Sequence, residues 1–134
     1  MRFILGAVVG ILIAFGAGWF LGSSGRSELD RSVQSAEVRS DLFEARSSVL
    51  AARVDLYNVN FGNASRNLES AKRVVSRASE RLKNSGREEE AKRLDPALTQ
   101  LDEAQALAGR FDQGANARAG SAAQTIDEVL GLAR

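Results

Sequence analysis

The chain has 134 residues, a formal net charge of +1, one proline, and neither cysteine nor histidine. The lack of cysteine and histidine excludes disulfides, thiolate nucleophiles, Cys/His zinc sites and the commonest general base. A nearly neutral chain has no global electrostatic attraction to nucleic acid, so we expect no nucleic-acid partner.

The first feature along the chain is an apolar segment, residues 3–22, which contains no charged or polar side chain. As a helix it spans roughly 30 Å, the hydrocarbon thickness of a bilayer. Trp19 and Phe20 lie near its end, where aromatic side chains favour the membrane interface. We expect residues 1–22 to be a transmembrane anchor in the lipid bilayer. The alternative, a cleaved signal peptide, is disfavoured by the length of the segment and by the lack of an A-x-A site.

Small residues recur every four positions in this segment. A spacing of four places them along one helix face, where another helix can approach the backbone closely. The alternative is that glycine is simply frequent in membrane helices. We expect this face to pack against a second copy or another membrane protein. Its members are Gly6, Gly10, Ala14, Gly18 and Gly22.

The first thirty residues also carry a family resemblance, through residues 6–10 (GAVVG), 18–22 (GWFLG) and 24–29 (SGRSEL). These motifs resemble the start of YtxH-type small bacterial membrane proteins, which combine a glycine-ladder anchor, a Ser-Gly-basic exit and a helical tail. The chain lacks the Ala-Pro-Lys usual at that exit. The resemblance implies a bacterial membrane-tethered helical protein and no defined activity.

The orientation is predicted from the flanks of the apolar segment. Only Arg2 and the α-amine precede it, and a very short N-terminal tail usually stays inside. Arg26 and Arg31 on the other side favour the opposite orientation. We expect a single-pass protein of the bacterial inner (plasma) membrane, with a periplasmic or extracytoplasmic C-terminal domain.

Residues 23–37 follow as a flexible exit and a juxtamembrane helical stalk. From Leu29 onward, apolar residues alternate spacings of four and three, which is typical of a coiled-coil seam. Ala36, Ser40 and Ser47 occupy other positions of the same repeat. The candidate helix–helix seam consists of Leu29, Val33, Phe43, Leu50, Val54, Tyr57 and Phe61.

A second apolar stripe with the same spacing begins at residue 38, on another side of the helix. A helix with two stripes needs neighbours on two sides, as in a bundle. A stripe left without a neighbour would indicate a missing partner helix. The second stripe consists of Val38, Leu42, Ala45, Val49, Ala52, Leu56 and Val59.

The patterns predict an all-α fold: a single N-terminal transmembrane helix followed by an antiparallel three- to four-helix bundle over residues 38–134. The Asn-rich segment 58–63 and Asn84-Ser85-Gly86 predict breaks. At Asp95-Pro96 either the helix kinks or Asp95 caps a new helix. The expected helices are about 27–58, 62–84, 88–110 and 115–131.

Charge supports the pairing of the middle helices. Residues 61–87 contain seven basic and two acidic residues, whereas residues 88–112 contain three basic and seven acidic residues. Consecutive antiparallel helices of opposite charge attract each other, so we expect these two to be neighbours.

No residue pattern indicates catalysis, a metal site or a cofactor. Serine lacks a base, and we expect every acidic residue to lie on a polar face with an ordinary pKa. The sequence predicts a non-catalytic, membrane-tethered interaction or scaffold module, a small subunit of an envelope assembly. A protein partner or homo-oligomer would form through the transmembrane helix. The alternatives are a self-associating structural stalk and a bundle that binds lipid or a small molecule.

Overall fold

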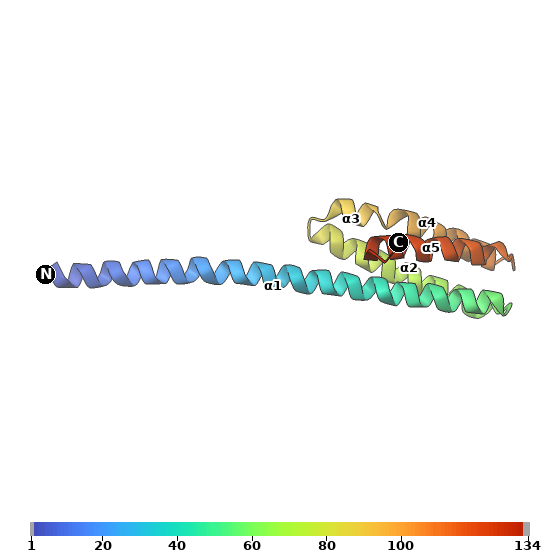
Figure 1. The fold of residues 1–134 in the computed structure, drawn as a ribbon, viewed down its shortest axis with the longest axis horizontal. Helices are drawn as coiled ribbons and strands as arrows, with labels where there is room; N and C mark the ends of the chain where they lie inside the picture. The colour runs from blue at the N-terminus through green and yellow to red at the C-terminus, as the bar shows by residue number, and fades with distance from the viewer. Residues whose placement is uncertain (1, 133–134) are drawn as a thin grey trace. The chain divides into compact units, whose positions relative to one another are not determined.

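The structure is a computed structural model that describes the backbone of residues 2–132 and the side chains of residues 28–132. In chain order the helices are α1 (Arg2–Tyr57), α2 (Phe61–Asn84), α3 (Glu88–Lys92), α4 (Asp95–Ala108) and α5 (Gly114–Leu130) (Figure 1). The described residues contain no strand, so the expected all-α class is confirmed. The chain forms two compact units, residues 1–34 and 35–134.

The described residues of the first unit, 2–34, all belong to α1. The helix continues through residues 22–25, where the sequence predicts a flexible exit. A glycine inside a helix costs only about 1 kcal/mol relative to alanine, so two glycines need not end it. Among the residues whose side chains are described, no helix is long and apolar enough to cross a membrane. The apolar segment 3–22 and its face of small residues lie outside them, so the anchor stays a prediction.

In the second unit, the C-terminal part of α1 lies between α2 and α5. Toward α2, Asn67 donates a hydrogen bond to Asp55 at 2.8 Å, and Arg77 donates one to Asp41 at 2.8 Å. Residue numbers rise along one helix as they fall along the other, so the two helices are antiparallel. Toward α5, Arg53 Nε donates to Asn116 at 3.1 Å. The ion pair of Arg46 with Asp127 confirms the antiparallel direction there too.

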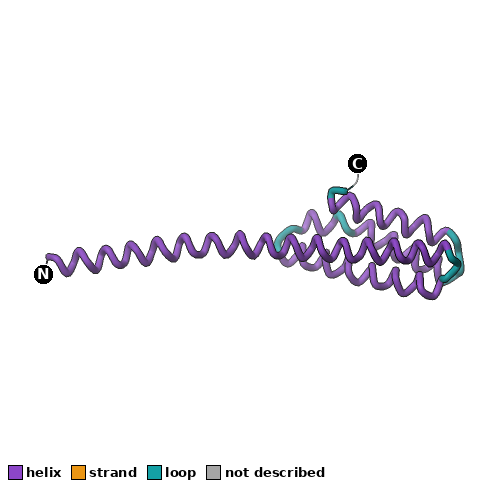
Figure 2. Tube along the Cα trace, turned by 60° about the horizontal axis from the view of Figure 1, so that its bottom comes forward, coloured by secondary structure: helices purple, strands orange, loops and turns teal. Residues whose placement is uncertain are grey.

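The remaining contacts close the ring. Between α2 and α4, Gln105 donates a hydrogen bond to Glu69 at 2.9 Å, and Lys72 pairs with Asp102. Between α4 and α5, Thr125 donates to Gln100 at 3.0 Å. The order α1–α2–α4–α5 and back to α1 is an up-down-up-down four-helix bundle. Figure 2 shows these helices lying lengthwise beside one another. The predicted attraction between the basic α2 and the acidic α4 is therefore realised by actual contacts.

The second stripe of α1 faces the interior of this bundle. From Val38 to Leu56 all its members are buried, as predicted, and only Val59 is exposed. Half of the buried apolar residues of the core are alanine. Small side chains let the helices approach closely, but each buries little area. At about 25 cal/mol per Å² the core is therefore modest, and polar bridges between helices matter more.

One polar bridge corrects a prediction. Asp41, expected on a polar face, is only 7% exposed. Its Oδ1 accepts hydrogen bonds from Nε and Nη2 of Arg77 at 3.1 and 2.8 Å, and Arg81 Nε lies 3.0 Å from Oδ2. The hydrogen bond from Arg77 to Asp41, and the charge of that carboxylate, raise the pKa of Arg77 above its ordinary value. A buried carboxylate is tolerated because it is paired.

The ends of α2 confirm the breaks read from the sequence. Asn60 caps its start by accepting a hydrogen bond from the backbone of Asn63 at 3.3 Å. At its end, Gly86 has a φ of +75°, which favours glycine. The backbone N–H groups of Gly86 and Arg87 donate to the carbonyls of Lys83 and Leu82 at 2.9 Å each. This pattern is the Schellman motif, which ends a helix at a glycine.

The structure decides between the two alternatives at Asp95-Pro96. The predicted helix 88–110 is two helices, α3 and α4, and Pro96 lies in the first turn of α4. Asp95 is the first residue of α4, and the capping position belongs to Leu94, which makes no side-chain cap. The expectation that Asp95 caps the new helix is therefore wrong by one residue. The proline lacks a backbone N–H, which costs nothing in a first turn.

The buried carboxylate predicts a stability difference. The variant Asp41→Asn keeps the shape but removes the charge held by Arg77, and we expect it to lower the free energy of unfolding by about 1.5–3 kcal/mol. Glu44, an exposed residue of the same network, is the matched control. For Glu44→Gln we expect a change below about 1 kcal/mol. Chemical denaturation followed by helical circular dichroism measures both, and equal effects would contradict the role of Asp41.

A second prediction concerns the start of α3. The hydrogen bond from Arg87 lowers the pKa of the Glu90 carboxyl below its ordinary value of 4.5. A lowered pKa in the folded state stabilises the fold above pH 4.5, and this contribution disappears as pH falls through the folded pKa. The carboxyl ¹³C shift of Glu90 should therefore titrate below 4.5. In Arg87→Gln the midpoint should return toward 4.5, and an unchanged midpoint would contradict this cause.

Candidate interaction surface

The first stripe of α1 does not face the bundle core. At about 100° per residue, its members lie on the side of the helix roughly opposite the buried stripe. Tyr57 is 82% exposed and Val54 61%, and Phe43 and Leu50 are also exposed. Within the first unit, Leu29 and Val33 are exposed as well. We call the members of this stripe in the second unit, from Ala36 to Tyr57, the outer seam.

Phe61 is the exception among the predicted seam residues. It begins α2 and is buried in the core of the bundle. Its ring contacts that of Phe111 edge-on, with the centroids 5.4 Å apart. The 4-3 spacing predicts Phe61 as a seam residue. The helix ends at Tyr57, however, and Phe61 begins a new helix that runs in the opposite direction. The structure therefore brings together the α1 members of the stripe and separates Phe61 from them.

The outer seam is not a gap in an incomplete bundle. α1 already has α2 and α5 as neighbours, and the ring of four helices closes within this chain. Both neighbours pack beside the inner stripe, and no helix among the described residues covers the outer seam. Four large apolar side chains exposed on one helix face, Phe43, Leu50, Val54 and Tyr57, are typical of an interaction surface.

Charged residues flank the outer seam in two rows of opposite sign. Glu37 and Glu44 lie along one edge, and Arg39, Arg46 and Arg53 lie along the other. Several of these charges also bind the neighbouring helices: Glu37 pairs with α2 and Arg46 with α5. The surface therefore combines an apolar centre with a charged border on each side.

Arg39 differs from the other charges of the border. Its guanidinium carbon lies 5.4 Å from the centre of the Phe43 ring, a cation–π distance. Within residues 28–132 it makes no ion pair. Its charge is thus free to meet a carboxylate of a partner.

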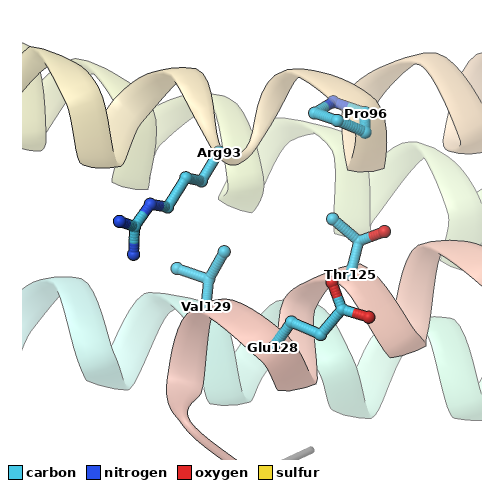
Figure 3. Close-up of a pocket in the computed structure, with 5 residues that line it drawn as sticks. All are labelled: Arg93, Pro96, Thr125, Glu128 and Val129. Carbon is cyan, nitrogen blue, oxygen red and sulfur yellow. The ribbon is translucent and has the colours of Figure 1, made fainter.

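The polar recesses of the bundle offer little for a ligand. One, of about 420 Å³, is lined by Arg93, Pro96, Thr125, Glu128 and Val129 (Figure 3). The charged ends of Arg93 and Glu128 turn away from each other across it. None of its lining residues belongs to the buried core. Its polar groups do not converge on a common point, so the recess has no chemistry that would fix a bound molecule.

The acidic run 88–90 serves local pairing. Glu90 pairs with Arg87, and Glu89 pairs with Lys92 at 2.7 Å. Among the side chains that the structure describes, no group of three or more acidic residues is placed to hold a metal ion. The run also lies in the first turn of α3, where negative charge is favourable.

Two non-glycine residues have a strained backbone that the sequence does not predict. Val59 and Phe111 both have a φ of +58°, a conformation that glycine or asparagine normally adopts. Both are exposed, in the turns after α1 and α4. No sequence signal marks them, because a valine and a phenylalanine in turns of this kind are unusual.

The exposure of the outer seam predicts that two valines of α1 contribute differently to the free energy of unfolding. Val49 is completely buried, so Val49→Ala should lower the free energy of unfolding by about 2 kcal/mol through lost burial and a cavity. Val54→Ala should change it by less than about 0.5 kcal/mol at low protein concentration. Denaturation of both variants checks this, and an equal cost at Val54 would mean that the seam is packed within the chain.

The sequence matches no protein-family model, and no match was found among curated proteins or among solved structures.

Proposed function

We propose that this chain is a non-catalytic, membrane-tethered interaction module that docks a protein partner on the outer seam of α1. The observation that carries the proposal is a bundle closed by its own helices that still exposes a row of large apolar side chains. Burying such a row against a partner removes apolar area from water, which is the main driving force of association.

The tether completes this proposal. The apolar segment 3–22 is long enough to span a bilayer, and its small residues at every fourth position suit close packing of a second membrane helix. The protein would be a single-pass component of a bacterial inner membrane, with the bundle on the extracytoplasmic side. The resemblance of the first thirty residues to YtxH-type proteins agrees with such an anchor.

The lack of catalytic groups supports a binding role. The chain has no histidine or cysteine. In the described part, the buried carboxylate of Asp41 is held by two arginines. Paired groups of this kind stabilise a fold and leave no site for a substrate.

Photo-crosslinking of the full chain in a bacterial host tests the docking surface. The photoreactive residue p-benzoyl-phenylalanine replaces Phe43 on the seam or, as a control, Phe111 in the turn after α4. Phe111 is 74% exposed, more than Phe43, so accessibility alone favours the control. We expect protein adducts from position 43 and none from position 111. Equal labelling, or no adduct from position 43, would contradict the proposal.

The tether is tested in the same cells. The full chain should stay in the membrane fraction after alkaline carbonate extraction, which removes peripheral proteins. Arg substitutions at Gly10 and Ala14, which place charge in the centre of the apolar segment, should release it, because a charge at the bilayer centre costs at least about 2.5 kcal/mol. Recovery of the unmodified chain in the soluble fraction would contradict the tether.

A further inference from the structure

The outer seam has the residue pattern of one strand of a coiled coil. The inward-facing positions of a heptad are called a and d. The d positions are Ala36, Phe43, Leu50 and Tyr57, and the a positions are Ser40, Ser47 and Val54. Leu50 and Val54 match the leucine at d and the valine at a that favour two parallel strands.

The two rows of charge fall on the positions that border such a seam. Glu37 and Glu44 follow a d position directly and are e residues. Arg39, Arg46 and Arg53 precede an a position directly and are g residues. In a coiled coil, e and g residues make the ion pairs that set partner choice and orientation. One edge of the seam is therefore acidic and the other basic.

This arrangement distinguishes the possible orientations of an identical helix. In a parallel pair, each g residue faces the e residue five positions later on the other copy, so Arg39 faces Glu44. In an antiparallel pair, g faces g and e faces e, which sets arginine against arginine and glutamate against glutamate. Like charges at such positions repel. The charges are thus complementary in a parallel pair and repulsive in an antiparallel one, and the shared membrane anchor of the two copies favours the parallel pair that is in register.

We propose that the partner on the outer seam is a second copy of this chain, bound parallel and in register through residues 36–57. The inference rests on the proposed interaction function and names its partner. Arg39 makes no ion pair within the described residues, so its charge is available to a second copy. Glu44 pairs with Arg77 at 2.9 Å, but its side chain is 56% exposed. Arg77 keeps its hydrogen bonds to Asp41 when Glu44 turns toward a partner, so the buried ion pair of the bundle is retained.

The serines at two a positions set the strength of this contact. Ser40 and Ser47 bury little apolar area, so the seam alone associates weakly. Two chains anchored in one membrane are held at a high effective concentration, which makes a weak contact sufficient. Anchoring also places both N-terminal ends at the same bilayer, which is the parallel orientation that the charges require.

Cysteine crosslinking in liposomes tests the orientation, because the natural chain has no cysteine. The full chain is reconstituted as Ser40→Cys or as Val54→Cys and treated with a short bis-maleimide crosslinker. The two positions lie about 21 Å apart along the helix. Only a parallel, in-register pair brings each position close to its own copy. Ala106→Cys, exposed on α4, measures random collision.

We expect both seam variants to give a species of twice the 14.4 kDa chain mass, well above the Ala106→Cys background. Crosslinking at only one of the two seam positions would indicate an antiparallel or shifted pair and would overturn the proposal. Background levels at both would overturn it as well.

Charge exchange tests the pairing itself in the Val54→Cys chain. Arg39→Glu and Glu44→Arg should each lower dimer formation about threefold to tenfold, because each sets like charges together in both halves of the pair. The double variant should restore it. Arg110→Glu, an exposed residue outside the seam, is the control for the charge change. If the double variant forms as little dimer as the single variants while its circular dichroism is unchanged, the proposal is overturned.

The two proposals fail separately. If both cysteine variants stay at background while position 43 still forms adducts with another protein, the second copy is excluded and the docking surface stands. If neither experiment yields any adduct, both proposals fall.

Discussion

Everything in the bundle follows from the geometry of α1, which carries apolar stripes on two opposite faces. A helix can turn only one face into a given core, so the other must meet water or another molecule. The inner face, from Val38 to Leu56, is enclosed because α2 and α5 are tied to α1 from either side. The same ties leave the outer seam exposed. The same helix contacts therefore both close the bundle and leave the outer seam exposed.

The polar contacts at the helix edges compensate for a core of small side chains. Alanine fills half of the buried apolar positions, which brings the helices close but limits the area removed from water. Close approach of the helices also shortens the distance that a side chain must span to reach the next helix. Arg77 of α2 can therefore bind the buried Asp41 of α1. Two kinds of contact thus favour the same antiparallel packing: small residues in the interior and charged residues at the helix edges.

Periodicity alone predicted the all-α class, the break at Gly86 and the two apolar stripes of α1, because these depend on residues close in sequence. It could not decide which of two equally spaced stripes forms the core. The outer stripe contains the larger side chains, Phe43 and Tyr57, and looks the better candidate. The choice depends on alanines of α2, α4 and α5, far along the chain. The burial of Asp41 escaped prediction for the same reason, since it depends on Arg77, 36 residues away.

The placement of large and small residues argues that the outer seam serves a partner. A chain adapted only to fold alone would gain stability by burying phenylalanine, leucine and tyrosine and exposing alanine. Here the core is built largely of alanine, and these larger side chains lie outside on α1, bordered by an acidic and a basic row. Exposed apolar rows invite unspecific association, and the charged borders restrict which partner and which orientation are accepted. In the proposed function, the bundle supports α1 so that its outer seam is presented to a partner.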